Sequence, residues 1–147
     1  LIPGGPVGYA IETLRLRDAD GRQVHRVRLT GTSIAAGTVA EITVAAHIAP
    51  VCVLQRVNCY NATGGSMTNR QPDITQGPTG QTSVAASYPV HYQATSTAKA
   101  DDISDTGLRL VLAIPETESL YYRMVPDGGS DNTETVDLYF LDVTAGQ

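Results

Sequence analysis

Alternating hydrophobic and polar positions mark three consecutive β-strands toward the end of the chain, between Leu108 and Val143. Each segment places apolar side chains at every second position, which is the period of a strand. The segments are 108–114, 120–125 and 136–143, and turn-forming residues separate them at Pro115 and at 126–130. Some positions of the opposite face are also apolar, namely Val111, Val125, Tyr139 and Leu141. We therefore expect these strands to be covered on part of both faces, in a sandwich core or against a neighbouring subunit.

The clearest turn signal is the pair Asp20-Gly21, which lies between strand-like segments at 11–17 and 22–29. An Asp-Gly pair favours a two-residue hairpin turn. With this loop, Leu14 faces Val27, Leu16 faces His25 and Arg15 faces Arg26. One face of the predicted hairpin is then mostly apolar. The other face carries Val24 and four arginines, Arg15, Arg17, Arg26 and Arg28.

Further strand-like segments occur at 38–46, 51–60 and 87–94, and Pro89 predicts that the last one lies at a sheet edge. Residues 61–83 are polar and rich in Gly, Pro, Thr and Asn, so we expect a long polar loop there. Residues 1–8 hold two prolines and three glycines, which predicts an extended N-terminal arm. About eight strands and no amphipathic helix of useful length predict an all-β fold. We expect residues 9–147 to form a single-domain antiparallel β-sandwich, jelly-roll-like.

Composition and charge restrict the classes of partner. The chain has 147 residues and a formal net charge of −5, with five Arg and three acidic residues in residues 1–30 against two Arg and ten acidic residues in residues 101–147. No basic footprint covers the chain, so we expect no nucleic-acid partner. No apolar segment approaches 18 residues, so we expect no membrane span. The chain begins without Met or a signal-like segment, and we expect it to be either processed or preceded by further residues.

No pattern in the sequence is typical of catalysis or cofactor binding. The three histidines, His25, His47 and His91, lack metal-ligand spacing, and neither a nucleophile elbow nor a phosphate-binding glycine loop is present. We therefore predict no catalytic residue, no metal site and no cofactor. An enzyme built from acids or histidines that converge from separate loops remains an alternative.

The two cysteines, Cys52 and Cys59, are predicted to be free thiols. They lie seven positions apart in one strand-like segment, which corresponds to roughly 23 Å of extended chain. That separation is far beyond disulfide reach. The odd spacing also predicts that they lie on opposite faces of the strand.

Interface residues are predicted from three features of the sequence. Arginine makes bidentate contacts with acidic surfaces, and tyrosine suits positions that are half buried and half hydrated. The four arginines of the predicted hairpin face, together with an arm that reaches across a neighbour, favour contacts between protein chains. The predicted interface residues are Arg15, Arg17, Arg26, Arg28, Ile2, Pro3, Pro6, Tyr88 and Tyr92.

The arm Leu1–Gly8, the polar segment 61–83 and the closing strand that ends in Leu138-Tyr-Phe-Leu-Asp142 together resemble the head decoration (cement) proteins of tailed bacteriophages. The resemblance implies a non-enzymatic accessory virion protein that sits on the capsid surface and stabilises it. Its partners would be other copies of itself, commonly in a trimer, and the major capsid protein or another virion protein. Its location would be the virion, or otherwise extracellular. Two alternatives stay open: a monomeric module that binds a glycan or a surface protein through 61–83, Tyr88 and Tyr92, and a tail or fibre component.

Overall fold

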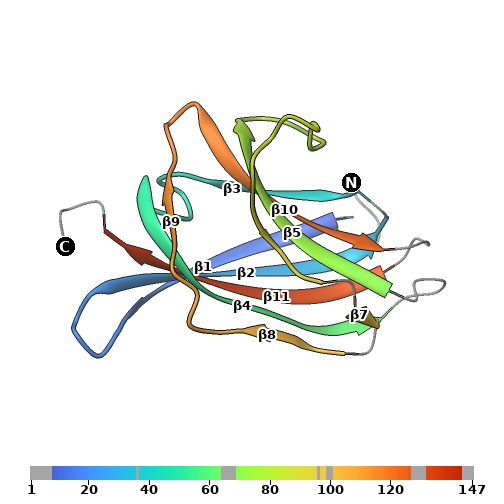
Figure 1. Ribbon diagram of the computed structural model, residues 1–147, viewed down its shortest axis with the longest axis horizontal. Coiled ribbons are helices and arrows are strands. Elements are labelled where there is room, and N and C mark those ends of the chain that lie inside the picture. Colours follow the sequence, from blue (N-terminus) through green and yellow to red (C-terminus); the bar gives the residue numbers. More distant parts are fainter. Residues whose placement is uncertain are drawn as a thin grey trace, which may run out of the picture.

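The computed structural model describes residues 8–35, 37–63, 69–95, 97–98, 101–126 and 132–143. These residues form eleven strands in two antiparallel sheets (Figure 1). The sheets enclose one hydrophobic core, so the predicted all-β sandwich is confirmed. Within these residues no helix is long and apolar enough to cross a membrane.

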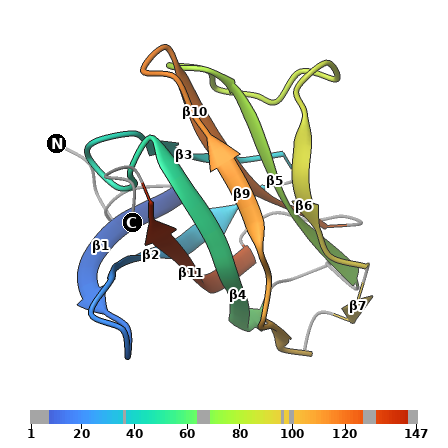
Figure 2. The same cartoon turned by 60° about the vertical axis from the view of Figure 1, so that its left-hand side comes forward.

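The larger sheet has six strands in the order β1-β2-β11-β4-β8 (Figure 1), and β9 also pairs with β4 (Figure 2). Its long strands lie side by side and carry the candidate site described below. Their bounds are Gly8–Arg17 (β1), Gln23–Ile34 (β2), Asn132–Asp142 (β11), Val51–Thr63 (β4), Ile103–Asp105 (β8) and Leu110–Ala113 (β9).

The smaller sheet has five strands in the order β3-β10-β5-β6, and β7 also pairs with β5. Their bounds are Val39–Thr43 (β3), Glu118–Pro126 (β10), Asn69–Pro78 (β5), Val90–Gln93 (β6) and Thr97–Ala98 (β7).

The strand pairs are nested. β2 pairs with β11, β3 with β10, β4 with β8 and β9, and β5 with β6. The first half of the chain therefore pairs with the second half in reverse order, which is the connectivity of a jelly roll. β1 adds one strand beside β2. The predicted jelly-roll arrangement is confirmed.

The core contains apolar side chains from both sheets, because each strand turns every second side chain inward. Fully buried members include Val27, Leu54, Leu138 and Phe140 from the larger sheet and Ile42, Ile74, Leu120 and Met124 from the smaller one. Burial of this continuous apolar surface is the main favourable term in folding.

The prediction of one long polar loop over 61–83 is wrong. β4 continues to Thr63, and residues 69–78 form β5, which lies between β10 and β6 in the smaller sheet. β5 is polar in sequence, but its charged side chains find partners in the fold. Arg70 pairs with Glu134, and Asp73 pairs with Arg123. These tertiary contacts, which local composition does not reveal, permit a polar strand inside the sheet.

The predicted register of the first hairpin is wrong by one residue. Gly21 has φ +80°, while Asp20 is not among the residues with positive φ, so the two-residue turn with both residues left-handed does not form. The amide of Gly21 donates to the carbonyl of Asp18, and the amide of Asp18 donates to the carbonyl of Arg22, both at 3.0 Å. This is a three-residue loop that ends in a left-handed glycine. Leu14 therefore lies opposite Arg26, Arg15 opposite His25, and Leu16 opposite Val24.

A β-bulge in β4 changes the prediction for the two cysteines. Arg56 lies opposite Tyr139, and Leu54 lies opposite Phe140, so Gln55 is an extra residue in the strand. The bulge reverses the alternation of faces, and Cys52 and Cys59 both lie in the core. The prediction that they occupy opposite faces is wrong; both cysteines are buried and neither forms a disulfide in the structure.

The predicted N-terminal arm lies almost wholly outside the described residues. This applies to residues 1–7, and therefore to the predicted interface residues Ile2, Pro3 and Pro6. Gly8, the last residue of the predicted arm, is the first residue of β1.

Candidate functional site

Five apolar side chains form a line across the outer face of the six-stranded sheet, one from each of five neighbouring strands. The cross-strand register places them opposite one another from β1 through β2, β11 and β4 to β9. They are Leu16, Val24, Leu141, Val53 and Val111, and we call them the apolar row. Their sequence neighbours His25, Phe140 and Leu54 face the core, so the row faces outward. Val111 is 70% exposed, whereas Val24 and Leu141 are largely covered by neighbouring side chains.

A hollow of about 610 Å³ lies over one end of the apolar row. Three members of the row line it, and the segment before β9 completes its wall. The lining residues are Arg22, Val53, Gln55, Gly107, Leu108, Arg109, Val111, Leu141 and Val143. The hollow therefore combines an apolar floor with two guanidinium groups.

A second line of side chains runs beside the apolar row and combines aliphatic, aromatic and cationic groups. Its members lie opposite one another in the order Leu14, Arg26, Tyr139 and Arg56. The guanidinium carbon of Arg56 lies 5.4 Å from the centroid of the Tyr139 ring, which is a cation–π contact. Within the described residues, the Nε atoms of Arg26 and Arg56 are buried without a hydrogen-bond partner. Leu14 is 43% exposed.

A third line of side chains contains Arg28 and Asp137, which lie opposite each other on β2 and β11. It differs from the first two because these charges are matched within the chain. Arg28 donates from Nε to Oδ1 of Asp137 at 2.8 Å and from Nη2 to Oδ2 at 3.1 Å. The Tyr60 hydroxyl donates to Oδ2 of the same carboxylate at 3.1 Å. Burial raises the pKa of Asp137, but these hydrogen bonds and the Arg28 charge outweigh burial and hold the pKa below its usual value. The part of the outer face whose apolar and cationic groups are not matched within the described part of the chain therefore consists of the apolar row and the line of Leu14, Arg26, Tyr139 and Arg56.

The structure separates the four hairpin arginines that the sequence placed on one face. Arg15 and Arg17 lie on the core side of the sheet beyond the packed interior, whereas Arg26 and Arg28 lie on the outer side. The one-residue register shift is the physical reason, because it moves every side chain of one strand to the other face relative to its partner strand. The expectation of a four-arginine face is wrong.

The two tyrosines predicted for an interface pack against the protein itself. Tyr92 is 7% exposed and belongs to the core, and its hydroxyl donates to Asp105. The Tyr88 ring lies over Gly77 and packs against the Tyr121 ring, with centroids 6.2 Å apart. Tyr92 therefore offers no ring face to a partner, and Tyr88 is only partly available.

A cluster of buried polar groups lies in the core, away from the outer face. Arg70 and Glu134 are both fully buried, with Nη1 and Oε2 3.4 Å apart, and the Tyr122 hydroxyl donates to Oε1 of Glu134 at 2.7 Å. Burial raises the pKa of Glu134 to about 7. No group of three or more His, Cys, Asp or Glu side chains in the described part of the chain could hold a metal ion.

Comparisons with known proteins add little to this geometry. No protein-family model matches the chain, and no curated protein matches it. A solved structure titled "CBM4 structure and function" is similar over 92% of this chain and 94% of that chain, with 15% sequence identity and a TM-score of 0.28. Similarity at that TM-score carries no argument about what this chain binds.

Sequence reasoning found part of the outer face and missed its continuity. The sequence indicates that Val111, Tyr139 and Leu141 are apolar positions covered on the outer face. It does not place Leu16 beside Val24, because the predicted β1–β2 register is wrong, and it predicts no pairing for Val53. A signal was present at Val51–Leu54 and at 110–112, where consecutive apolar residues indicate strands that are apolar on both faces.

Proposed function

We propose that this protein is a non-enzymatic β-sandwich that works by docking the outer face of its six-stranded sheet on another protein surface. One observation carries the proposal: an apolar side chain occupies the outward position of five adjacent strands at the same level of the sheet. A solvated face of an antiparallel sheet is normally polar at such positions. Val111 is 70% exposed, and Leu14 of the neighbouring line is 43% exposed. Exposed apolar side chains on one sheet face favour an interaction site there.

The composition of the neighbouring line supports the same conclusion. Tyrosine and arginine are enriched at the centres of protein interfaces, where they contribute much of the binding energy. Tyr139, Arg26 and Arg56 stand directly beside the apolar row, and Leu14 extends the apolar surface along β1. A partner would therefore present apolar side chains together with acidic groups.

Charge complementarity favours a second copy of this chain as one such partner. Arg26, Arg56 and Arg109 lie on or beside the docking face, whereas Arg22, which borders its hollow, pairs with Asp18 and Asp20 of its own turn. The C-terminal third of the chain carries ten acidic residues against two arginines. A basic face that meets an acidic region of the next copy makes a head-to-tail contact, and such contacts close into rings when the rotation permits. We propose a homo-oligomer, with a trimer favoured.

The finer proposal is an accessory virion protein located on the capsid surface, which docks on the major capsid protein or another virion protein. The resemblance to phage decoration proteins supports this role. Jelly rolls occur both in viral capsid proteins and in lectin domains, so the fold is compatible with a virion role but does not distinguish it from ligand binding. The competing assignments are a tail or fibre component and a monomeric module that binds a surface protein or glycan.

The test is the oligomeric state of the full chain, measured by light scattering after size exclusion at low and high salt. Val111→Glu places a charge in the docking face, and Val90→Glu is the matched control because Val90 is 54% exposed on β6 of the other sheet. We expect a closed oligomer for wild type and Val90→Glu, and dissociation for Val111→Glu. A wild type that is monomeric at both salt concentrations contradicts self-association. Equal disruption by both variants contradicts the assignment of the face.

A further inference from the structure

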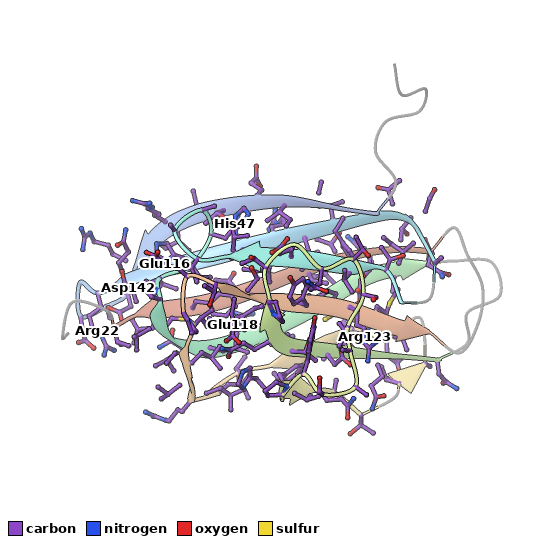
Figure 3. The ribbon with its side chains drawn as sticks, turned by 90° about the horizontal axis from the view of Figure 1, so that it is seen from above. Arg22, His47, Glu116, Glu118, Arg123 and Asp142 are labelled. Carbon is purple, nitrogen blue, oxygen red and sulfur yellow. The ribbon has the colours of Figure 1, made fainter. Side chains whose placement is uncertain are left out.

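A pocket of about 310 Å³ lies at one end of the sandwich, on the opposite side of the six-stranded sheet from the docking face. The ends of β1, β2 and β11 form one wall, and the turn after β3 forms the other. His47 and Asp142, one from each wall, both lie toward the left-hand end of the molecule in Figure 3. This volume is at the lower end of the range for small-molecule sites, which suits a single ring better than a chain.

The sheet wall contributes charged and polar groups at adjacent positions. Arg15 lies directly opposite His25 in the β1–β2 register, and His25 lies opposite Phe140 of β11. Asp142 follows Phe140 by two residues and so faces the same side of the sheet. Gln23 and Thr13 complete this wall.

The opposite wall is a tight turn that is tied to β1. The Ala45 amide donates to the Ile48 carbonyl at 2.9 Å, and the His47 amide donates to the Thr43 carbonyl at 3.1 Å. Nδ1 of His47 and Oγ1 of Thr13 are 2.8 Å apart. Ala45 has φ 76°, a strained conformation for a residue with a Cβ. Strain of this kind is typical of binding sites, where the surrounding structure maintains it.

His25 provides a second and independent indication of a ligand. Its side chain is 7% exposed, lines the pocket, and has an Nδ1 atom without a hydrogen-bond partner among the described residues. Buried polar atoms are almost always paired, and an unpaired one calls for an explanation. A polar ligand in the pocket supplies such an explanation.

The pocket has one positive and one negative side chain among its described lining residues, Arg15 and Asp142. Burial lowers the pKa of both His25 and His47; for His25 the Arg15 charge adds to this effect and the Asp142 charge opposes it. Both imidazoles are therefore neutral near pH 7. His25 can offer Nδ1 to a ligand, and His47, whose Nδ1 contacts Thr13, can offer Nε2. Among the described residues that line the pocket, the Arg15 guanidinium and the Asp142 carboxylate remain as the charged groups. An anionic ligand would meet Asp142, and a cationic ligand would meet Arg15.

We propose that this pocket binds a small uncharged polyhydroxyl ligand of the size of one sugar ring. Neighbouring hydroxyl groups can each accept a hydrogen bond from Arg15 or Gln23 and donate one to Asp142 or an imidazole nitrogen. The C–H face of such a ligand can contact the apolar part of the wall, formed by Ala45, Ala46, Ile48 and Pro50. The described residues that line the pocket include no Tyr or Phe, so they do not provide the stacking platform that an extended sugar chain requires.

This inference goes beyond the proposed docking function and is compatible with it. The apolar row and the pocket lie on opposite faces of the same sheet, so a docked subunit keeps the pocket accessible. The oligomeric state tests the first proposal and ligand binding tests the second, and either one can fail alone.

The three histidines make the test specific. The full chain, with its imidazoles observed by NMR, is titrated separately with glucose, galactose, mannose and N-acetylglucosamine. We expect saturable shifts of the His25 and His47 signals with at least one sugar. The signals of His91, whose Nε2 lies 2.7 Å from Oε1 of Gln76 on the other sheet, should stay unchanged. Equal shifts of all three histidines, or no shift with any sugar, overturn the proposal.

Variants and a charged probe separate this ligand class from others. Arg15→Gln should weaken sugar binding at least 10-fold, because it removes the guanidinium of the pocket. Arg17→Gln is the matched control on the same strand and side, and it should bind as wild type does. Sodium acetate is the anionic probe. Saturable shifts with acetate and none with sugars would make the pocket an anion site and refute the polyhydroxyl ligand.

Discussion

Arg70 and Glu134 form an ion pair in which neither side chain is exposed, with 3.4 Å between Nη1 and Oε2. The pair joins β5 of one sheet to β11 of the other, and it explains how a polar segment became an interior strand. Burial raises the pKa of Glu134 to about 7, and the Tyr122 hydrogen bond and the Arg70 charge offset burial only in part. A buried pair of this kind couples stability to pH.

The first prediction concerns this coupling. Between about pH 4.5 and pH 7 the folded protein holds a proton on Glu134 that the unfolded chain has released, so this group makes the free energy of unfolding fall as pH rises. Glu134 pairs with Arg70 as a carboxylate only toward the upper end of this window and above it. The Glu134→Gln variant keeps an oxygen that can accept from Tyr122 and cannot titrate. We expect the stability difference between wild type and E134Q to change by on the order of 3 kcal/mol across this window.

The measurement is denaturant unfolding at a series of pH values. Burial lowers the pKa of His25, His47 and His91, which makes stability rise with pH over part of the same window, so only the difference between wild type and variant isolates Glu134. Glu12→Gln, on the exposed side of β1, is the matched control. A difference that is flat with pH would contradict the assignment.

A second prediction concerns Gly77, where the backbone of β5 passes under the Tyr88 ring. A Cβ at this position would lie 2.5 Å from Cε2 of Tyr88 and 2.6 Å from Cδ2. Gly77→Ala should therefore cost about 1–3 kcal/mol of stability. In a Tyr88→Ala background the cost should vanish, and a double-mutant cycle by denaturant unfolding measures this coupling. Equal costs in both backgrounds would contradict the contact.

A third prediction concerns the turn that sets the hairpin register. Gly21 has φ +80°, which a side chain with a Cβ adopts at a cost of about 1–2 kcal/mol. Gly21→Ala should lower the free energy of unfolding by that amount. Gly21→Asn should cost less, because asparagine tolerates left-handed backbone. Thermal or denaturant unfolding compares the two, and an equal or reversed order would argue against the three-residue loop.

A fourth prediction concerns the two thiols. Burial raises the pKa of Cys52 to about 12 and raises the pKa of Cys59 as well, with the charges of Asp142 and Glu134 adding to the respective shifts. Because the thiolate is the reactive form, neither cysteine should react with a thiol reagent at pH 8 in the folded protein. Both should react in denaturant. Rapid labelling of the folded protein, seen by mass spectrometry, would contradict their burial.

A fifth prediction refines the docking face. The Arg56 guanidinium packs on the Tyr139 ring, which fixes it beside the apolar row. Arg56→Ala should weaken self-association at least 10-fold, because arginine anchors of this kind contribute much of the binding energy. Arg17→Ala, at an exposed position of β1, should leave it unchanged. The concentration dependence of the mass in light scattering gives both dissociation constants, and equal effects would contradict the prediction.

Much of the fold could be predicted from local sequence. The period-two segments of β1, β2, β3, β4, β10 and β11 were found because each buries one face in a common core. β5 was missed because its side chains are polar and its partners, Glu134 and Arg123, come from the distant strands β11 and β10. The candidate docking face was found only at three positions, since its continuity depends on how five strands align.

By itself the sequence determined that the protein is an all-β sandwich, because hydrophobic alternation and turn residues act within a few positions of each other. Only the tertiary structure decided which residues share a face. One left-handed glycine in the first turn placed Arg15 beside His25 and Leu16 beside Val24, and one bulge residue in β4 brought Cys52 and Cys59 to the same side. A single residue of register reverses inside and outside along a whole strand, and cooperative packing against the other strands selects that register.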